Sequence, residues 1–107
     1  MVDHELDELR REFLTEAEEK VREIETTLSA DQNAAALDRL AYLAHQLKGS
    51  GGSYGYQRIS TDAAEIEKAV ERIAKGDSGG SKDKIREHVA NLRAEISRST
   101  EELSARA

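Results

Sequence analysis

The chain of 107 residues has no cysteine, no proline and no tryptophan, and its only aromatic residues are three tyrosines and one phenylalanine. Without cysteine, the chain can form neither a disulfide framework nor a cysteine metal site. Without proline, helices can run on without interruption. The remaining composition is rich in alanine, leucine, glutamate, lysine and arginine, which are strong helix formers, and it predicts an all-α protein.

The chain also has no excess of basic residues and no long apolar run. The formal net charge is −6, which disfavours nucleic acid as a partner because phosphate binding needs a basic face. No apolar run approaches the ~20 residues needed to cross a bilayer, and the N-terminal segment MVDHE does not resemble a signal peptide. We therefore expect a cytoplasmic protein that is monomeric, has no membrane partner and forms one domain over residues 1–107.

Apolar residues recur at steps of three and four along four stretches, residues 3–29, 33–52, 56–75 and 81–103. This spacing places them on one face, so each stretch predicts an amphipathic helix. The first two stripes comprise Leu6, Leu9, Phe13, Ala17, Val21, Ile24 and Leu28, then Leu37, Leu40, Ala44, Leu47 and Gly51. The last two comprise Ile59, Ala63, Ile66, Val70 and Ile73, then Ile85, Val89, Leu92, Ile96 and Leu103.

The segments between these stretches carry helix-ending and helix-starting residues. Asp31 or Asn33 can cap the second helix, and Ser81 can cap the fourth. A basic last turn followed by Gly76 predicts the end of the third. Because the connectors are short, neighbouring helices must be antiparallel, and we expect an up-down-up-down four-helix bundle.

A strip on the second helix holds the residues with chemical potential. His45 lies one residue, about 100°, off the predicted core stripe. Residues at i+3, i+4 and i+7 share a face, so the strip continues through Lys48, Gly49 and Gly52, and Ala41 precedes it by one turn. Each glycine costs roughly 1 kcal/mol in a helix interior. Either the helix ends near Gly49, or something needs the space.

The third helix offers a partner for the histidine. If the chain turns near Tyr56, then His45 and Glu67 lie eleven residues to either side of it and at the same level. A carboxylate that accepts a proton from one ring nitrogen makes the other nitrogen the better nucleophile. By the same count Lys48 lies opposite Ala64, so we expect its ammonium to be free to swing toward a phosphoryl group.

The segment AHQLKGSGGSYGY, residues 44–56, closely resembles the signature of histidine-containing phosphotransfer (HPt) domains, and EFLTEA, residues 12–17, resembles their first helix. The resemblance covers roughly residues 10–75. It implies a phosphorelay carrier without kinase activity that passes a phosphoryl group between receiver-domain aspartates. The implied partners are response-regulator receiver domains and a hybrid or chemotaxis-type histidine kinase.

The resemblance also implies roles for individual residues. His45 would accept the phosphoryl group through Nε2, and Lys48 would stabilise it. Ala41, Gly49 and Gly52 would leave a docking surface clear for the partner. Glu67 is similar to the glutamate that orients the histidine in chemotaxis-type kinases. No cofactor is implied for this chain, since the receiver supplies Mg²⁺.

Two other functions remain open from the sequence. The chain could be the phosphoacceptor domain of a chemotaxis-type kinase, although Ala64 stands where such domains often carry a second histidine. It could also be a non-catalytic helical interaction module whose glycine strip only docks another protein. A zinc site on His45 and Glu67 is disfavoured because no third ligand converges there and no HEXXH spacing is present.

Overall fold

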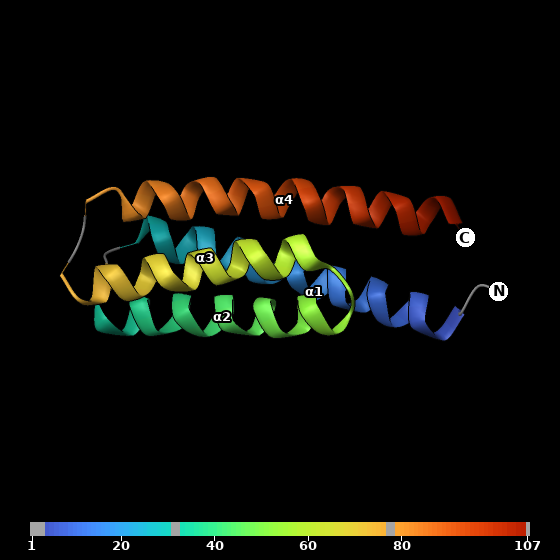
Figure 1. Ribbon diagram of the computed structural model, residues 1–107, viewed down its shortest axis with the longest axis horizontal. Helices are drawn as coiled ribbons and strands as arrows, with labels where there is room; N and C mark the ends of the chain where they lie inside the picture. The colour runs from blue at the N-terminus through green and yellow to red at the C-terminus, as the bar shows by residue number, and fades with distance from the viewer. Residues whose placement is uncertain (1–3, 31–32, 77–78, 107) are drawn as a thin grey trace.

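A computed structural model describes residues 4–30, 33–76 and 79–106 of the chain. Four helices follow one another: α1 (His4–Ser29), α2 (Ala34–Ser53), α3 (Gln57–Ala74) and α4 (Ser81–Arg106) (Figure 1). The predicted helices are therefore confirmed to within a few residues, and α4 continues through the polar tail. Asn33 caps α2, because its side-chain oxygen accepts a 2.8 Å hydrogen bond from the Ala36 amide. The alternative cap, Asp31, lies outside the described residues.

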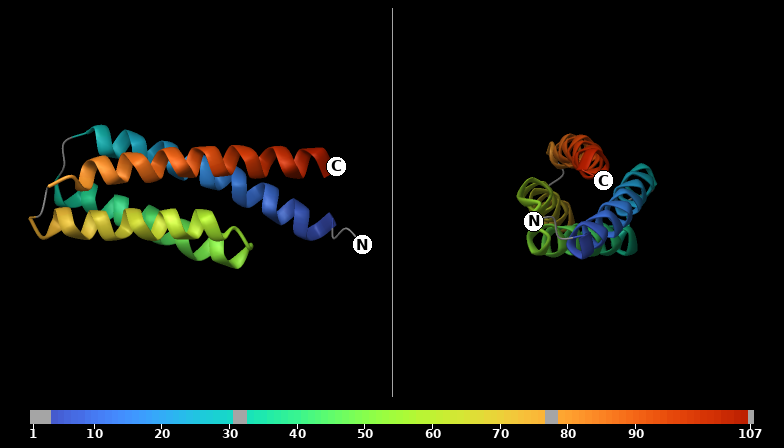
Figure 2. Two further views of the ribbon diagram at one scale, coloured as in Figure 1. Left: turned by 45° about the horizontal axis from the view of Figure 1, so that its top comes forward. Right: turned by 90° about the vertical axis from the view of Figure 1, so that its right-hand side faces the viewer.

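The helices alternate in direction around a shared centre, which confirms the predicted up-down-up-down bundle (Figure 2). Each helix packs against the next in the chain, and α4 also packs against α1. Both termini lie at one end, where α1 and α4 extend past the turn between α2 and α3 (Figure 1). Within the described ranges, no helix is long and apolar enough to span a bilayer.

The core consists of the predicted stripes with few exceptions. Ile24, Leu40, Ala44, Ile66 and Leu92 are each completely buried. Leu37 and Ile73 pack at its margin and are only partly buried. Leu43 and Leu14 are buried although neither belonged to a predicted stripe.

Leu9 was predicted to be buried, and that prediction is wrong, since 46% of the residue is exposed. The neighbouring Arg10 donates through Nε to the carbonyl of Tyr54 at 3.4 Å, so the α2–α3 turn lies at this level of α1. Leu9 lies before that level, in the part of α1 that extends past the ends of α2 and α3. Neither of these helices, over the residues that the structure describes, packs against it there.

The turn between α2 and α3 is fixed by aromatic packing and by backbone. The Phe13 ring stacks on Tyr54 and Tyr56 with centroid distances of 5.2 and 5.7 Å. Gly55 adopts φ +84°, a region that side chains disfavour. The Tyr56 amide then donates to the carbonyl of Gly51 at 2.8 Å.

The glycine cluster does not end α2, which continues to Ser53. A Cβ on Gly51 would lie 3.1 Å from the Ser60 backbone nitrogen and 3.2 Å from Ile59 Cγ2, so this glycine lets α3 approach closely. A Cβ on Gly49 would meet nothing within 4 Å. The interpretation that the helix ends near Gly49 is therefore wrong, and the need for space holds at Gly51 but not at Gly49.

The two glycines should respond oppositely to substitution. Gly49→Ala should raise the free energy of unfolding by about 0.5–1 kcal/mol, because alanine is the better helix former and has room. Gly51→Val should lower it by about 1–3 kcal/mol through overpacking against α3. Urea unfolding followed by circular dichroism measures both, and equal shifts for the two variants would contradict the packing described.

Candidate functional site

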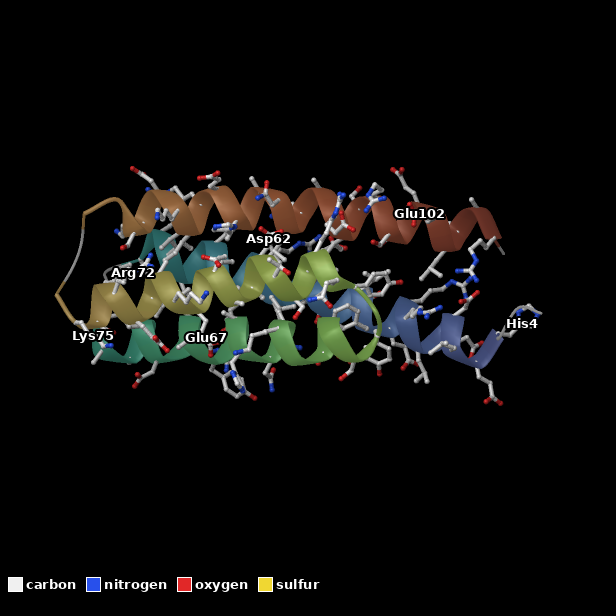
Figure 3. All side chains as sticks on the ribbon, in the orientation of Figure 1. His4, Asp62, Glu67, Arg72, Lys75 and Glu102 are labelled. Carbon is white, nitrogen blue, oxygen red and sulfur yellow. The ribbon has the colours of Figure 1, made fainter. Side chains whose placement is uncertain are left out.

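His45 lies on α2 at the seam with α3, and 68% of its side chain is exposed. Its Nδ1 lies 2.9 Å from Oε2 of Glu67 on α3. The predicted facing of these two residues is therefore confirmed, and Figure 3 shows Glu67 between the two helices. The imidazole is held from one side only, and most of the ring remains open to solvent.

Lys48 does not stand free as we expected. Its Nζ donates a 2.7 Å hydrogen bond to Oε1 of Glu67, so one carboxylate holds both residues. Counting residues from the turn near Tyr56 missed this contact because it compares backbone positions only. A lysine side chain is long enough to reach across a full helical turn.

The charge on Glu67 decides the tautomer of His45. Hydrogen bonding from Lys48 lowers the pKa of Glu67, the hydrogen bond from His45 lowers it further, and desolvation opposes both. The carboxylate is thus ionised at neutral pH and can only accept hydrogen bonds. Nδ1 of His45 must therefore be the donor, and in the neutral ring Nε2 carries the lone pair.

A shallow hollow of about 590 Å³ opens beside His45 on the side of α1. It is lined by Glu16, Lys20, His45, Gln46, Gly49, Ser50, Ser53 and Tyr54. The contribution from α1 was not foreseen in the sequence, where the charged residues of this helix looked like a solvated face. An approaching molecule would therefore meet charges from α1 on this side of the histidine.

The three residues expected to keep a surface clear occupy different places. Gly49 lines the hollow. Gly52 is exposed but lies on the α3 side, where a Cβ would be 3.7 Å from Ser60 Oγ. Ala41 is partly buried and packs against the core one turn before His45. All three have little or no side-chain bulk, but only Gly49 borders the hollow.

A second histidine–carboxylate pair joins α3 to α4. His88 Nδ1 lies 2.8 Å from Oδ1 of Asp62, which also accepts a 3.3 Å hydrogen bond from Asn91. Only 22% of the His88 side chain is exposed. Sequence reasoning missed this pair, because the connector between α3 and α4 is longer than the one between α2 and α3 and gives no single turn residue from which to count levels. Among the residues that the structure describes, no group of three or more His, Cys, Asp or Glu side chains could hold a metal ion.

The family model described as Hpt domain matches residues 8–102, which is nearly the whole chain. The chain therefore belongs to the Hpt domain family, and its class of activity is histidine phosphotransfer in two-component signalling. The match extends into α4 as far as residue 102, well beyond the part in which the sequence motif was visible. No curated protein and no solved structure gives a significant match.

The ionised state of Glu67 has a consequence for stability. A group whose pKa is lowered by folding stabilises the fold above its unfolded pKa and loses that contribution as pH falls through the folded value. Glu67→Gln should therefore cost up to about 1 kcal/mol at pH 7, and the gap from wild type should close below the usual glutamate value of 4.5. Urea unfolding of both proteins at pH 7 and pH 3 measures this, and a gap independent of pH would refute it.

Proposed function

We propose that this Hpt domain carries a phosphoryl group on Nε2 of His45, receiving it from a receiver-domain aspartyl phosphate and passing it to another receiver. The observation that supports this most directly is the exposed imidazole whose Nδ1 is tied to the Glu67 carboxylate. The tie fixes the ring and leaves the lone pair on the nitrogen that faces away from Glu67. The hollow beside it gives a second protein room to approach.

The transfer step conserves atoms and charge without help from a base. The Nε2 lone pair attacks phosphorus in line, the N–P bond forms, and the P–O bond to the aspartate breaks. The aspartate leaves as a carboxylate. The positive charge that develops on the ring lies next to the Glu67 carboxylate, which accepts the Nδ1 proton in a hydrogen bond and stabilises it. The reverse reaction uses the same groups.

Lys48 would supply positive charge to the transferring phosphoryl oxygens. One of its three N–H donors is occupied by Glu67, and the others remain for a phosphoryl group. Because 38% of the Lys48 side chain is exposed, it can shift toward the incoming group. Glu67 is then a positioning residue for both His45 and Lys48.

The partner receiver would bring the rest of the chemistry. It holds the aspartate, and we expect the Mg²⁺ that in-line transfer uses to be bound there, with no cofactor in this chain. Ala41, Gly49 and Gly52 would let its surface come close to α2. This chain would act as a phosphocarrier and contribute no kinase activity.

A second candidate is the phosphoacceptor domain of a chemotaxis-type histidine kinase, phosphorylated from ATP by a catalytic domain. The contact between Glu67 and His45 favours it, because the glutamate is similar to the one in that class. The presence of Ala64 in place of a second histidine favours the carrier. Incubating the chain with phosphorylated receivers or with a kinase catalytic domain separates these two functions. A non-catalytic interaction module would be labelled by neither.

Replacement of the proposed acceptor should abolish labelling. His45→Gln should accept no phosphoryl group from a phosphorylated receiver while keeping its helical circular dichroism, because the exposed ring makes no contribution to the core. His88→Gln is the matched control, since it removes the other carboxylate-bound histidine and should be labelled like wild type. An acid-labile, base-stable label that survives in His45→Gln would place the acceptor elsewhere.

Removal of the proposed cation should slow transfer without preventing it. Lys48→Ala should lower the transfer rate roughly 10- to 100-fold, because the negative phosphoryl oxygens lose the nearby ammonium group that would donate hydrogen bonds to them. Lys68→Ala is the control, since Lys68 also pairs with a glutamate on the surface, Glu65, but not at this site. Rapid-quench experiments measure the rate of phosphoryl transfer to each variant. An equal rate for the two variants would remove Lys48 from the mechanism.

A further inference from the structure

We propose that Tyr42 on α2 is a docking anchor for the partner receiver, and that its ring contacts an apolar patch on that domain. This inference rests on the proposed function and extends it from the phosphoryl group to partner specificity. Within the described part of the chain, the exposed large hydrophobic residues are Leu9, at 46%, and Tyr42, at 50%. Of these two residues, Tyr42 lies next to the candidate phosphoacceptor, His45.

Tyr42 stands within reach of any protein that reacts with His45. The two residues are three positions apart on one helix, so they share a face and are separated by about 4.5 Å along the axis. A stable protein interface covers about 800 Å² on each partner. A receiver whose aspartate reaches Nε2 therefore also covers Tyr42.

The ring is held in place before any partner arrives. Gln46 Nε2 donates a 2.7 Å hydrogen bond to the Tyr42 hydroxyl, and the Arg39 guanidinium carbon lies 5.3 Å from the ring centroid. Arg39 is in turn held by Glu23 of α1 through two hydrogen bonds, one of them 2.9 Å long. A side chain fixed in this way loses little conformational entropy on binding, which favours a role as an anchor.

The space around Tyr42 continues to the histidine. A hollow of about 270 Å³ borders Tyr42, and it shares Glu16, Lys20 and Gln46 with the larger hollow beside His45. Together they form a groove along the α1–α2 seam, which we name the α1–α2 groove. On the opposite side of His45, the space is taken by Glu67 and Lys48. The docked protein should therefore extend over the α1 side.

The charges around Tyr42 indicate which kind of surface on the receiver would match it. Because Arg39 is paired with Glu23, the cation that lies over the ring is neutralised. Glu16, Glu19 and Lys20 of α1 line the same hollow, so the apolar contact is made by the ring itself. An apolar patch on the receiver is the matching surface, and an acidic one is not. A structural tyrosine would stabilise α2 but leave the transfer reaction unchanged, so kinetics can distinguish the two roles.

The test measures transfer from the receiver domain that reacts fastest among a panel. Tyr42→Ala should raise KM about 10-fold with kcat within twofold of wild type, because the ring contributes to docking and does not touch the reacting atoms. Tyr42→Phe should have a KM within about threefold of the wild-type value, since phenylalanine keeps the apolar ring. Leu9→Ala is the matched control for loss of an exposed hydrophobic residue, and it should leave KM unchanged.

The failure of this inference can be told apart from failure of the proposed function. Phosphoramidate, a small donor that needs no docked protein, should label wild-type His45, and absence of any label from it or from receivers would remove the proposed function. If wild type is labelled but KM is the same for Tyr42→Ala and Leu9→Ala, Tyr42 is no anchor. A wild-type dimer in sedimentation that Tyr42→Ala dissociates would assign the ring to a second copy of this chain and also overturn the proposal.

Discussion

The Glu67 carboxylate, shared between an imidazole and an ammonium group, is the interaction on which the candidate site depends. It can serve both because Glu67 approaches from α3 at the level of His45, and Lys48, one turn further along α2, reaches back to the same carboxylate with its long side chain. That level is set by the close approach of the two helices at Gly51 and by the tight turn that follows. A shift of one residue in either helix would carry the carboxylate around to another face.

The same carboxylate explains why the site needs no deep pocket. Its charge fixes the tautomer of the ring from one side and, in the proposed mechanism, would offset charge on the ring after phosphoryl transfer. The rest of the ring stays open to solvent, where a second protein can supply its own reactive group. The bundle beneath contributes rigidity, since Ala44 and Leu47 anchor this stretch of α2 in the core.

A histidine–carboxylate contact does not by itself make a candidate phosphotransfer site, and the pair formed by His88 and Asp62 shows what else differs. Its hydrogen bond is as short as that of His45, but its ring is mostly covered between α3 and α4. Among the residues that the structure describes, the further donor to its carboxylate is Asn91 and not a lysine. Exposure and a neighbouring cation therefore distinguish His45, and both properties follow from its position at the flank of the core stripe.

Helical periodicity and short connectors determined most of the fold. An apolar stripe at three- and four-residue spacing must be buried against other helices, and short connectors make neighbouring helices antiparallel. Sequence also placed His45 opposite Glu67, since equal distances from a tight turn give equal levels. It could not place Leu9, whose exposure depends on how far α1 outruns α2 and α3. Only the tertiary structure decided that Lys48 binds Glu67 and that α1 walls the groove beside His45. Those contacts depend on side-chain reach and on helix–helix separation, which residue spacing along one chain does not encode.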